Sequence, residues 1–370
     1  MHHELHTFYA TMQKATTPEE VFGGLPSTDP VTAAKHLYRQ FARLTHEDYH
    51  TAEDKPVARL AFTLLTTWWT QTQARIARGL YGTTAPTVPI VLEYKTLRYT
   101  VERTLGTGEL GHTYLATDRG GAAVIVKIAR NAAVNGLLEH EASRLAVLQK
   151  ASKTMQTLVS YIPPFLNTFP VKDATTGQVR RVLVYAYLPG YVPLTDVRAA
   201  FPTGVAPAAF VWMFNRLLTA LAFIHDVGGT GFVHGAILPP HVQIHPETHG
   251  LMLTEWGYGV AVGSRLSVMA RDYVAWYPPE IAAKRPVTAA TDLYQAALCM
   301  LYVLGGDVTK PTDALSNVPV RFQRFLHGCL LQNPARRPQA AWPLFEQFQT
   351  VAEAVLGPKR FVPFSLASST

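Results

Sequence analysis

The sequence predicts an α+β protein in which a small all-helical segment precedes a larger part, rich first in strands and then in helices. Up to about residue 82, apolar side chains recur at helical spacing. After residue 91, β-branched and aromatic residues follow strand patterns, and helical periodicity returns after about residue 205. Because 48% of the 370 residues are hydrophobic and only 16% are charged, we expect folded domains rather than global disorder.

Charge and composition exclude several classes of function. The net charge of +7 lies entirely in residues 83–370, since residues 1–82 carry eight basic and eight acidic side chains. These charges are scattered, so we expect no nucleic-acid-binding patch. The sequence has no run of 18 apolar residues and no secretory signal, and two cysteines are too few for a disulfide framework. We therefore expect a cytoplasmic protein that contacts no membrane.

Two prolines and three threonines, without any charged residue, predict a linker over residues 83–91. The chain then divides into a helical domain over 1–82, the linker, a strand-rich lobe over 92–190, and a helical lobe with a C-terminal tail over 191–370.

The first segment is predicted to form two main helices joined by a charged turn. Thr17-Pro18 is typical of a short helix start, Asp29-Pro30 begins the first main helix, and Pro56 precedes the second. Residues on one side of the first main helix form a basic stripe at i, i+4 and i+8: Lys35, Arg39 and Arg43. Three histidines near the start, His2, His3 and His6, are candidate ligands of a metal ion, but chance or a processing remnant is the favoured interpretation.

The helical hairpin resembles the J-domain of DnaJ-type co-chaperones over residues 17–82. The resemblance is carried by the basic helix, by a turn that begins with His46 and contains Asp48, and by a second helix that ends in Tyr-Gly. It implies a surface that engages a DnaK-type chaperone, made of Lys35, Arg39, Arg43, His46 and Asp48. The family has proline in the middle of the turn, where its ring locks φ, and this chain has Glu47. A helical hairpin with a solvated basic face is the alternative.

The strand-rich lobe begins with a glycine motif followed by a lysine and a glutamate. Gly106, Gly108 and Gly111 follow a strand-like run. Lys127 comes sixteen residues after the last of these glycines, at the end of an apolar run. A helix-like stretch then carries Glu141, with leucines at i+4 and i+7. Each of these signals is weak alone, but they occur in a fixed order.

This order resembles the small lobe of protein kinases. The resemblance implies that the three glycines and Lys127 hold nucleotide phosphates and that Glu141 pairs with the lysine, with Glu139 as the rival partner. It also places Tyr185 at the gatekeeper position and Tyr187 in the hinge, both beside the nucleotide.

Later segments continue the resemblance into a two-lobed protein kinase-like fold. The segments 234–241, 255–257 and 276–280 stand where the family has its catalytic loop, its Asp-Phe-Gly motif and its Ala-Pro-Glu motif. The resemblance implies structural roles, including a buried Glu280–Arg337 bridge, for His234, Glu280, Asp292 and Arg337.

The departures from the family pattern fall on its catalytic residues. Ala236 stands in place of the aspartate that accepts the substrate proton, and Leu238 in place of the lysine that steadies the phosphoryl group. His241 replaces the asparagine that binds the second magnesium, and Glu255 replaces the metal-binding aspartate. Gly235 replaces the arginine that reads an activation-loop phosphate, so we expect no phosphate-triggered activation.

The adenine side of the cleft is altered as well. The residues matched to the family's apolar sandwich are Thr113, Ile125 and Gln243, in place of valine, alanine and leucine. Isoleucine narrows the slot, and the polar amide needs its own hydrogen-bond partner. The resemblance therefore implies weak binding of ATP at most. It gives poor support for Mg²⁺ or Mn²⁺, for which Glu255 is the candidate ligand.

Our main interpretation is a regulatory or scaffolding protein of the pseudokinase type, fused to a degenerate J-like module and acting on an unidentified protein partner. One alternative is an active, atypical ATP-dependent Ser/Thr kinase that uses Glu255 for metal. The other is a co-chaperone that recruits a DnaK-type partner. The three interpretations differ in whether phosphate is transferred and whether a chaperone ATPase is stimulated.

Overall fold

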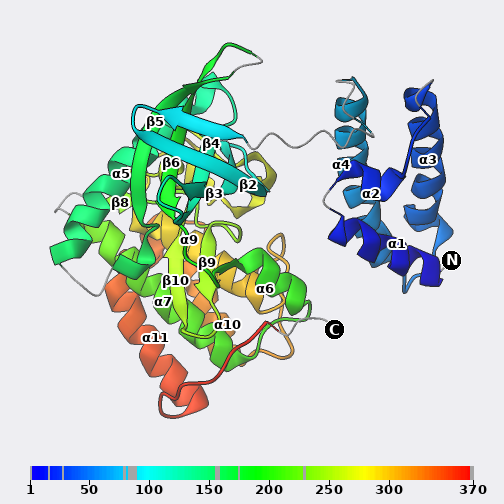
Figure 1. The fold of residues 1–370 in the computed structure, drawn as a ribbon. Helices are drawn as coiled ribbons and strands as arrows, with labels where there is room; N and C mark the ends of the chain where they lie inside the picture. The colour runs from blue at the N-terminus through cyan, green and yellow to red at the C-terminus, as the bar shows by residue number, and fades with distance from the viewer. Residues whose placement is uncertain are drawn as a thin grey trace. The chain divides into compact units, whose positions relative to one another are not determined.

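The computed structural model describes residues 2–15, 17–26, 29–77, 81, 90–154, 159–173, 176–227 and 231–366. The chain divides into two units, Met1–Val88 and Pro89–Thr370 (Figure 1), which we call the helical unit and the kinase-like unit. Of the predicted linker, only residues 90 and 91 are described, and Val91 already begins the first strand.

The helical unit contains four described α-helices: α1 (His2–Lys14), α2 (Pro18–Phe22), α3 (Pro30–Thr45) and α4 (Lys55–Ala77). The two main helices of the sequence prediction are α3 and α4, and the short start at Thr17 precedes α2. Helix α1 is not among the predicted elements. Its buried Leu5 and Met12 stand seven residues apart, a helical spacing that could have revealed it.

Capping and an apolar core hold the helical unit together. The side chain of Asp29 accepts a hydrogen bond from the backbone N–H of Thr32 at 3.1 Å, which caps α3 and lowers the pKa of Asp29. Trp68 of α4 packs in the core and donates its indole N–H to the carbonyl of Met12 at 3.1 Å. The sequence-distant α1 and α4 are thereby joined.

The kinase-like unit begins with a six-stranded antiparallel sheet in the order β1-β2-β3-β4-β6-β5 (Figure 1). Its strands are β1 (Val91–Tyr94), β2 (Leu97–Thr107), β3 (Gly111–Asp118), β4 (Ala123–Ala129), β5 (Phe165–Lys172) and β6 (Val179–Ala186). Helix α5 (Asn135–Thr154) packs against β5 and β6. Buried valine and isoleucine side chains of β4 and β6 form an apolar core beside the sheet, and such β-branched residues are common in strands.

The remainder of this unit is mainly helical. Its helices are α6 (Leu194–Ala200), α7 (Pro207–Asp226), α8 (Pro279–Ala282), α9 (Ala289–Val303), α10 (Val320–Cys329) and α11 (Ala341–Leu356). Short strands form two small sheets, β10-β9-β7 and β11-β8, from β7 (Val192–Pro193), β8 (Phe232–Val233), β9 (Val242–His245), β10 (Gly250–Leu253) and β11 (Val260–Ala261). One apolar core runs from α5 through α7 and α9 to α11.

Helix α7 is, among the described helices, the one long and apolar enough by length and composition to cross a membrane. Its side chains Met213, Phe214 and Leu217 are fully buried in the core of the kinase-like unit. The hydropathy of α7 is therefore explained by its place as a core helix.

Candidate functional site

A buried charge cluster joins three segments of the kinase-like unit. Nζ of Lys127, on β4, lies 2.7 Å from Oε2 of Glu141 on α5 and 2.9 Å from Oε2 of Glu255. The hydroxyl of Tyr185, on β6, donates to Oε1 of Glu141 at 2.8 Å. We call these four residues the cleft cluster. The structure brings together Lys127 and Glu141, whereas the rival Glu139 is exposed and pairs with Arg181.

The backbone of Glu255 is held in the left-handed region, with φ +65° and ψ 47°. Such a conformation is uncommon and costly for a residue with a side chain, and it is typical of functional sites. Glu255 precedes a 3-10 helix, Trp256–Tyr258, whose fully buried Trp256 donates its indole N–H to the carbonyl of Leu253 at 2.8 Å. Arg144 of α5 donates to the carbonyl of Trp256 at 3.1 Å, so α5 and this segment are linked directly.

Burial and mutual attraction shift the pKa of each charged member of the cleft cluster. Burial alone would lower the pKa of Lys127, but the attraction of Glu141 and Glu255 outweighs burial and raises it. Burial raises the pKa of Glu141 despite the nearby ammonium group. For Glu255 burial acts in the same direction, yet Lys127 and His241 together lower its pKa. Two carboxylates thus share one ammonium group.

The glycine motif forms the turn between β2 and β3. The backbone N–H of Gly108 donates to the carbonyl of Gly111 at 2.8 Å. A Cβ on Gly111 would lie 2.6 Å from the carbonyl oxygen of Ile128, so only glycine fits where β3 approaches β4. Open space surrounds the Cβ position of Gly106, so no such contact demands glycine there.

The side chain at the tip of this turn forms hydrogen bonds with residues 271 and 272, which belong to the same kinase-like unit. Oε1 of Glu109 accepts hydrogen bonds from the backbone N–H groups of Arg271, at 2.5 Å, and Asp272, at 3.3 Å. Leu110 is buried, and a Cβ on Gly257 would come within 2.8 Å of it. Neither Glu109 nor Leu110 was singled out from the sequence, since both occupy variable positions of the motif and their partners lie about 150 residues away.

The segment 234–241, which the sequence matches to the catalytic loop, is mostly apolar, and its residues 234–239 are buried. Ala236 and Leu238 are fully buried. Nδ1 of His241 lies 2.9 Å from the carbonyl oxygen of Ala236 and must donate to it, and its ring stacks on Tyr258. Burial lowers the pKa of His241. The segment 234–241 therefore contains no carboxylate side chain.

Hydrogen bonds with the side chains of His234 and Asp292 fix the backbone of this segment. The carboxylate of Asp292 accepts the N–H groups of His234 at 2.7 Å and Gly235 at 2.8 Å, and Nε2 of His225 lies 2.9 Å away. Nε2 of His234 donates to the carbonyl of Thr254 at 2.9 Å, while Nδ1 accepts the N–H of Ala236 at 3.3 Å. Burial lowers the pKa of His234 to about 4, so the ring is neutral.

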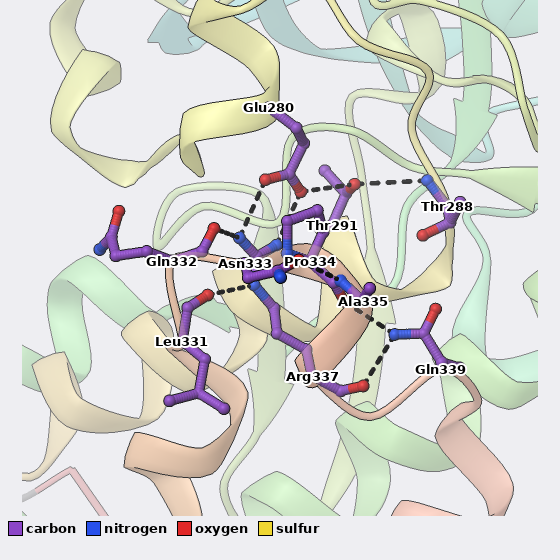
Figure 2. Close-up of polar contacts among 10 residues, drawn as sticks. All are labelled: Glu280, Thr288, Thr291, Leu331, Gln332, Asn333, Pro334, Ala335, Arg337 and Gln339. Carbon is purple, nitrogen blue, oxygen red and sulfur yellow. Dashed lines mark hydrogen bonds and ion pairs between the residues drawn. The ribbon is translucent and has the colours of Figure 1, made fainter.

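A second buried charge pair lies between α8 and the loop that precedes α11. Arg337 donates from Nη1 and Nη2 to the two carboxylate oxygens of Glu280 at 2.7 and 2.9 Å (Figure 2). The hydroxyl of Thr291 donates to the same carboxylate at 3.2 Å. The guanidinium also lies over the ring of Tyr294, 4.8 Å from its centroid. The structure therefore brings together Glu280 and Arg337 as a bidentate bridge.

The residues matched to the adenine side lie on three strands: Thr113 on β3, Ile125 on β4 and Gln243 on β9. Ile125 faces Tyr185 across the β4–β6 pair, and Tyr187 at the end of β6 is half-buried. Gln243 donates its side-chain amide to the carbonyl of Pro240 at 2.8 Å. The polar amide of Gln243 thus has a hydrogen-bond partner three residues earlier in the chain.

The predicted chaperone-binding residues lie on the helical unit. Lys35, Arg39 and Arg43 are all exposed on α3. Nδ1 of His46 accepts the backbone N–H of Asp48 at 3.3 Å, and Glu47 pairs with Arg59 of α4 at 2.5 Å. The turn therefore holds its shape through side-chain contacts in place of a proline.

No protein-family model matches the chain. Serine/threonine-protein kinase F of Synechocystis sp. is 28% identical over 236 residues, which cover 60% of this chain and 46% of that protein. Serine/threonine-protein kinase PkaA of Streptomyces coelicolor is 26% identical over 292 residues, which cover 70% of this chain and 50% of that protein.

A third relative, from Arabidopsis thaliana, is named a probable inactive receptor kinase; it is 25% identical over 217 residues, covering 58% of this chain and 32% of its own length. The chain thus spans half or less of the length of these curated relatives. Ser/Thr protein kinases bind ATP as a family. The comparisons give no support to J-domain identity for the helical unit. The mixed α+β architecture and these similarities together make the chain a distant homologue of the Ser/Thr protein kinases.

Proposed function

We propose that the kinase-like unit is a pseudokinase-type regulator or scaffold that transfers no phosphate. The observation that carries the proposal is Ala236, buried at the position of the catalytic base. Phosphoryl transfer depends on a group that orients the nucleophile and on charge stabilisation around the phosphate. An alanine methyl group supplies neither.

The carboxylate that contacts the backbone of this segment, Asp292, cannot take over the missing role. Asp292 is fully buried, and its two oxygens already accept the N–H groups of His234 and Gly235 and contact His225. Releasing it would leave several buried donors unpaired, each at a cost of about 1–3 kcal/mol.

The cleft cluster favours at most weak nucleotide binding. Lys127 is shared by Glu141 and Glu255, so two of its three N–H donors are already used and a phosphate group competes with two carboxylates for the ammonium group. The cluster contains one negative charge in excess, which repels a polyphosphate. The contacts of Glu109 with Arg271 and Asp272 also tie the glycine turn to another segment, which limits its freedom to adjust to a nucleotide.

Thermal unfolding of the full chain tests the proposal, with ATP added alone, with Mg²⁺ and with Mn²⁺. Lys127→Ala removes the ammonium group, and Lys150→Ala, an exposed lysine of α5, is the matched control. A ligand specific to the folded state adds about 2.7 kcal/mol of stability at a hundredfold excess over its Kd. A parallel assay measures transfer of the γ-phosphate to the chain itself and to a generic protein substrate.

Each outcome separates the interpretations. A shift that needs Lys127 but no metal supports a nucleotide-regulated pseudokinase, and no shift at millimolar ATP supports a scaffold. Phosphate transfer that is lost in Lys127→Ala and kept in Lys150→Ala overturns the proposal in favour of an atypical kinase using Glu255 for metal. In either supported case we propose that the unit acts on an unidentified protein partner in the cytoplasm.

For the helical unit, the second candidate function is recruitment of a DnaK-type chaperone. The exposed stripe of Lys35, Arg39 and Arg43 next to the His46 turn favours it. Its test is stimulation of a DnaK-type ATPase by the full chain. Stimulation should vanish in His46→Ala and persist in His36→Ala, an exposed histidine of α3. If the full chain gives no stimulation, the hairpin is a spacer with a solvated basic face.

A further inference from the structure

Three possible metal ligands converge where α1 meets the start of α4. Nδ1 of His2 lies 2.6 Å and Nε2 of His6 lies 3.2 Å from the same oxygen, Oδ1 of Asp54. One ligand atom from each of the three residues lies within 4.8 Å of the others. The two histidine side chains are 68% and 44% exposed, whereas that of Asp54 is only 7% exposed.

The helix geometry explains why the two histidines act together. His2 and His6 are four residues apart on α1, so both side chains project from one face of the helix. Asp54 comes from the turn before α4, about fifty residues later, and packing of α1 on α4 brings it beneath that face. The sequence showed the histidines, but only the folded chain supplies the carboxylate.

We propose that His2, His6 and Asp54 bind a divalent transition-metal ion, with Zn²⁺ as the favoured ion. Two imidazole nitrogens and one carboxylate oxygen match the borderline-soft donor set that Zn²⁺, Co²⁺ and Ni²⁺ accept. The same set is poor for Ca²⁺ and Mg²⁺, which take six or more oxygen ligands. The exposed side of the cluster leaves a fourth position open to water.

A bound ion would replace the two hydrogen bonds that Asp54 makes with His2 and His6. In a tetrahedral site with metal–ligand bonds of about 2.1 Å, ligand atoms lie about 3.4 Å apart. The ion therefore needs the His2–Asp54 contact to open by less than about 1 Å, while the His6–Asp54 separation is already close to the required value. A bound ion would pin α1 to α4.

The test is titration of the full chain, without a histidine tag, with ZnCl₂ by calorimetry and with CoCl₂ by visible absorption. The variants are His2→Ala, His6→Ala and Asp54→Asn. The matched control is His3→Ala, an exposed histidine on the same turn of α1 that lies outside the cluster. Circular dichroism and thermal unfolding in a chelator establish that each variant is folded. His2→Ala alters the most exposed ligand and leaves the core untouched.

We expect one Zn²⁺ per chain, with affinity reduced at least ~10-fold by each ligand variant and unchanged in His3→Ala, since losing even a supporting partner of a ligand costs that much. A tetrahedral Co²⁺ spectrum should disappear in Asp54→Asn. Binding that is as tight in Asp54→Asn as in the wild type would mean adventitious capture by terminal histidines and would overturn the proposal. Equal losses in His3→Ala and His6→Ala, or no binding, would overturn it as well. The proposal does not depend on the function of the kinase-like unit.

Discussion

The Glu280–Arg337 bridge is buried, and so is the cleft cluster apart from Glu255, yet the two are built on opposite principles. In the bridge, one guanidinium meets one carboxylate through two parallel hydrogen bonds, and Thr291 supplies a further donor. In the cleft cluster, two carboxylates compete for the single ammonium group of Lys127. The bridge is balanced in charge and the cluster is not.

This difference predicts that the bridge and the cluster respond differently to the loss of one charged side chain. A balanced buried pair is hard to break because removing one partner leaves an uncompensated charge. In the cleft cluster, which has two carboxylates and one ammonium group, the loss of one carboxylate leaves the ammonium group paired with the other. Glu255, with its left-handed backbone and a 22% exposed side chain, is that carboxylate.

The largest expected effect is that of Glu280→Gln. It leaves the buried guanidinium of Arg337 without a counter-charge, so the free energy of unfolding should fall by about 3–5 kcal/mol. Urea unfolding at neutral pH measures this, with Glu353→Gln on the exposed side of α11 as the control. A loss as small as in the control would mean that the bridge does not differ from a surface contact.

Acid should act next most strongly, through His234. Its pKa in the folded chain is about 4, below the unfolded value of 6.5, because burial disfavours the charged ring. The neutral ring therefore contributes its full stability above pH 6.5, and about 3 kcal/mol is lost as the pH falls from 6.5 to 4. The groups facing the ring are Asp292, His241 and Glu255.

Urea unfolding at several pH values tests this acid sensitivity. His234→Gln keeps an amide that can donate to Thr254 but does not titrate, so its stability should change less between pH 6.5 and 4. Identical pH profiles for wild type and variant would assign the acid sensitivity to other groups, such as His241.

A smaller effect is expected for Tyr185→Phe, which removes the hydroxyl that donates to Glu141. Hydrogen bonds to charged groups contribute about 1.5–3 kcal/mol, and the buried carboxylate loses one of its two partners. The neighbouring Tyr187→Phe, on a half-buried ring, should stay within about 0.5 kcal/mol of wild type in the same denaturation experiment. Equal losses in both variants would show that the Glu141 contact adds no stability.

The smallest expected effect on stability is that of Glu255→Gln, within about 1 kcal/mol, because Lys127 and Glu141 remain paired. Removing the second carboxylate should also lower the pKa of Glu141, which that carboxylate raises. Chemical denaturation beside Glu280→Gln makes the comparison direct. Equal destabilisation by the two substitutions would erase the distinction between cluster and bridge.

Much of the fold could be predicted from the sequence because its signals are local. Strand patterns, the Asp29-Pro30 helix start and the order of glycine turn, lysine and glutamate all depend on residues close in the chain. Helix α1 was missed because its apolar positions stand among polar neighbours, although Leu5 and Met12 have helical spacing. The domain limits at 83–91 fall mainly on residues that the structure does not describe.

The candidate site could be predicted only as a set of residues. Glu141 as the partner of Lys127 depended on helical spacing, which favours it over Glu139. The engagement of Glu255 by Lys127 depends on where a loop 128 residues further along the chain comes to rest. The contact of Glu109 with Arg271, and of His2 with Asp54, likewise has no signal in the local sequence.

By itself, therefore, the sequence determined most of the element types, the alanine at position 236 and the distribution of charge. These follow from residue identity and from periodicity along the chain. Only the tertiary structure decided that two carboxylates share Lys127, that Glu109 of the glycine turn accepts the N–H of Arg271, and that Asp54 contacts two histidines of α1. Each is a contact between distant segments, which core packing selects and no local pattern encodes.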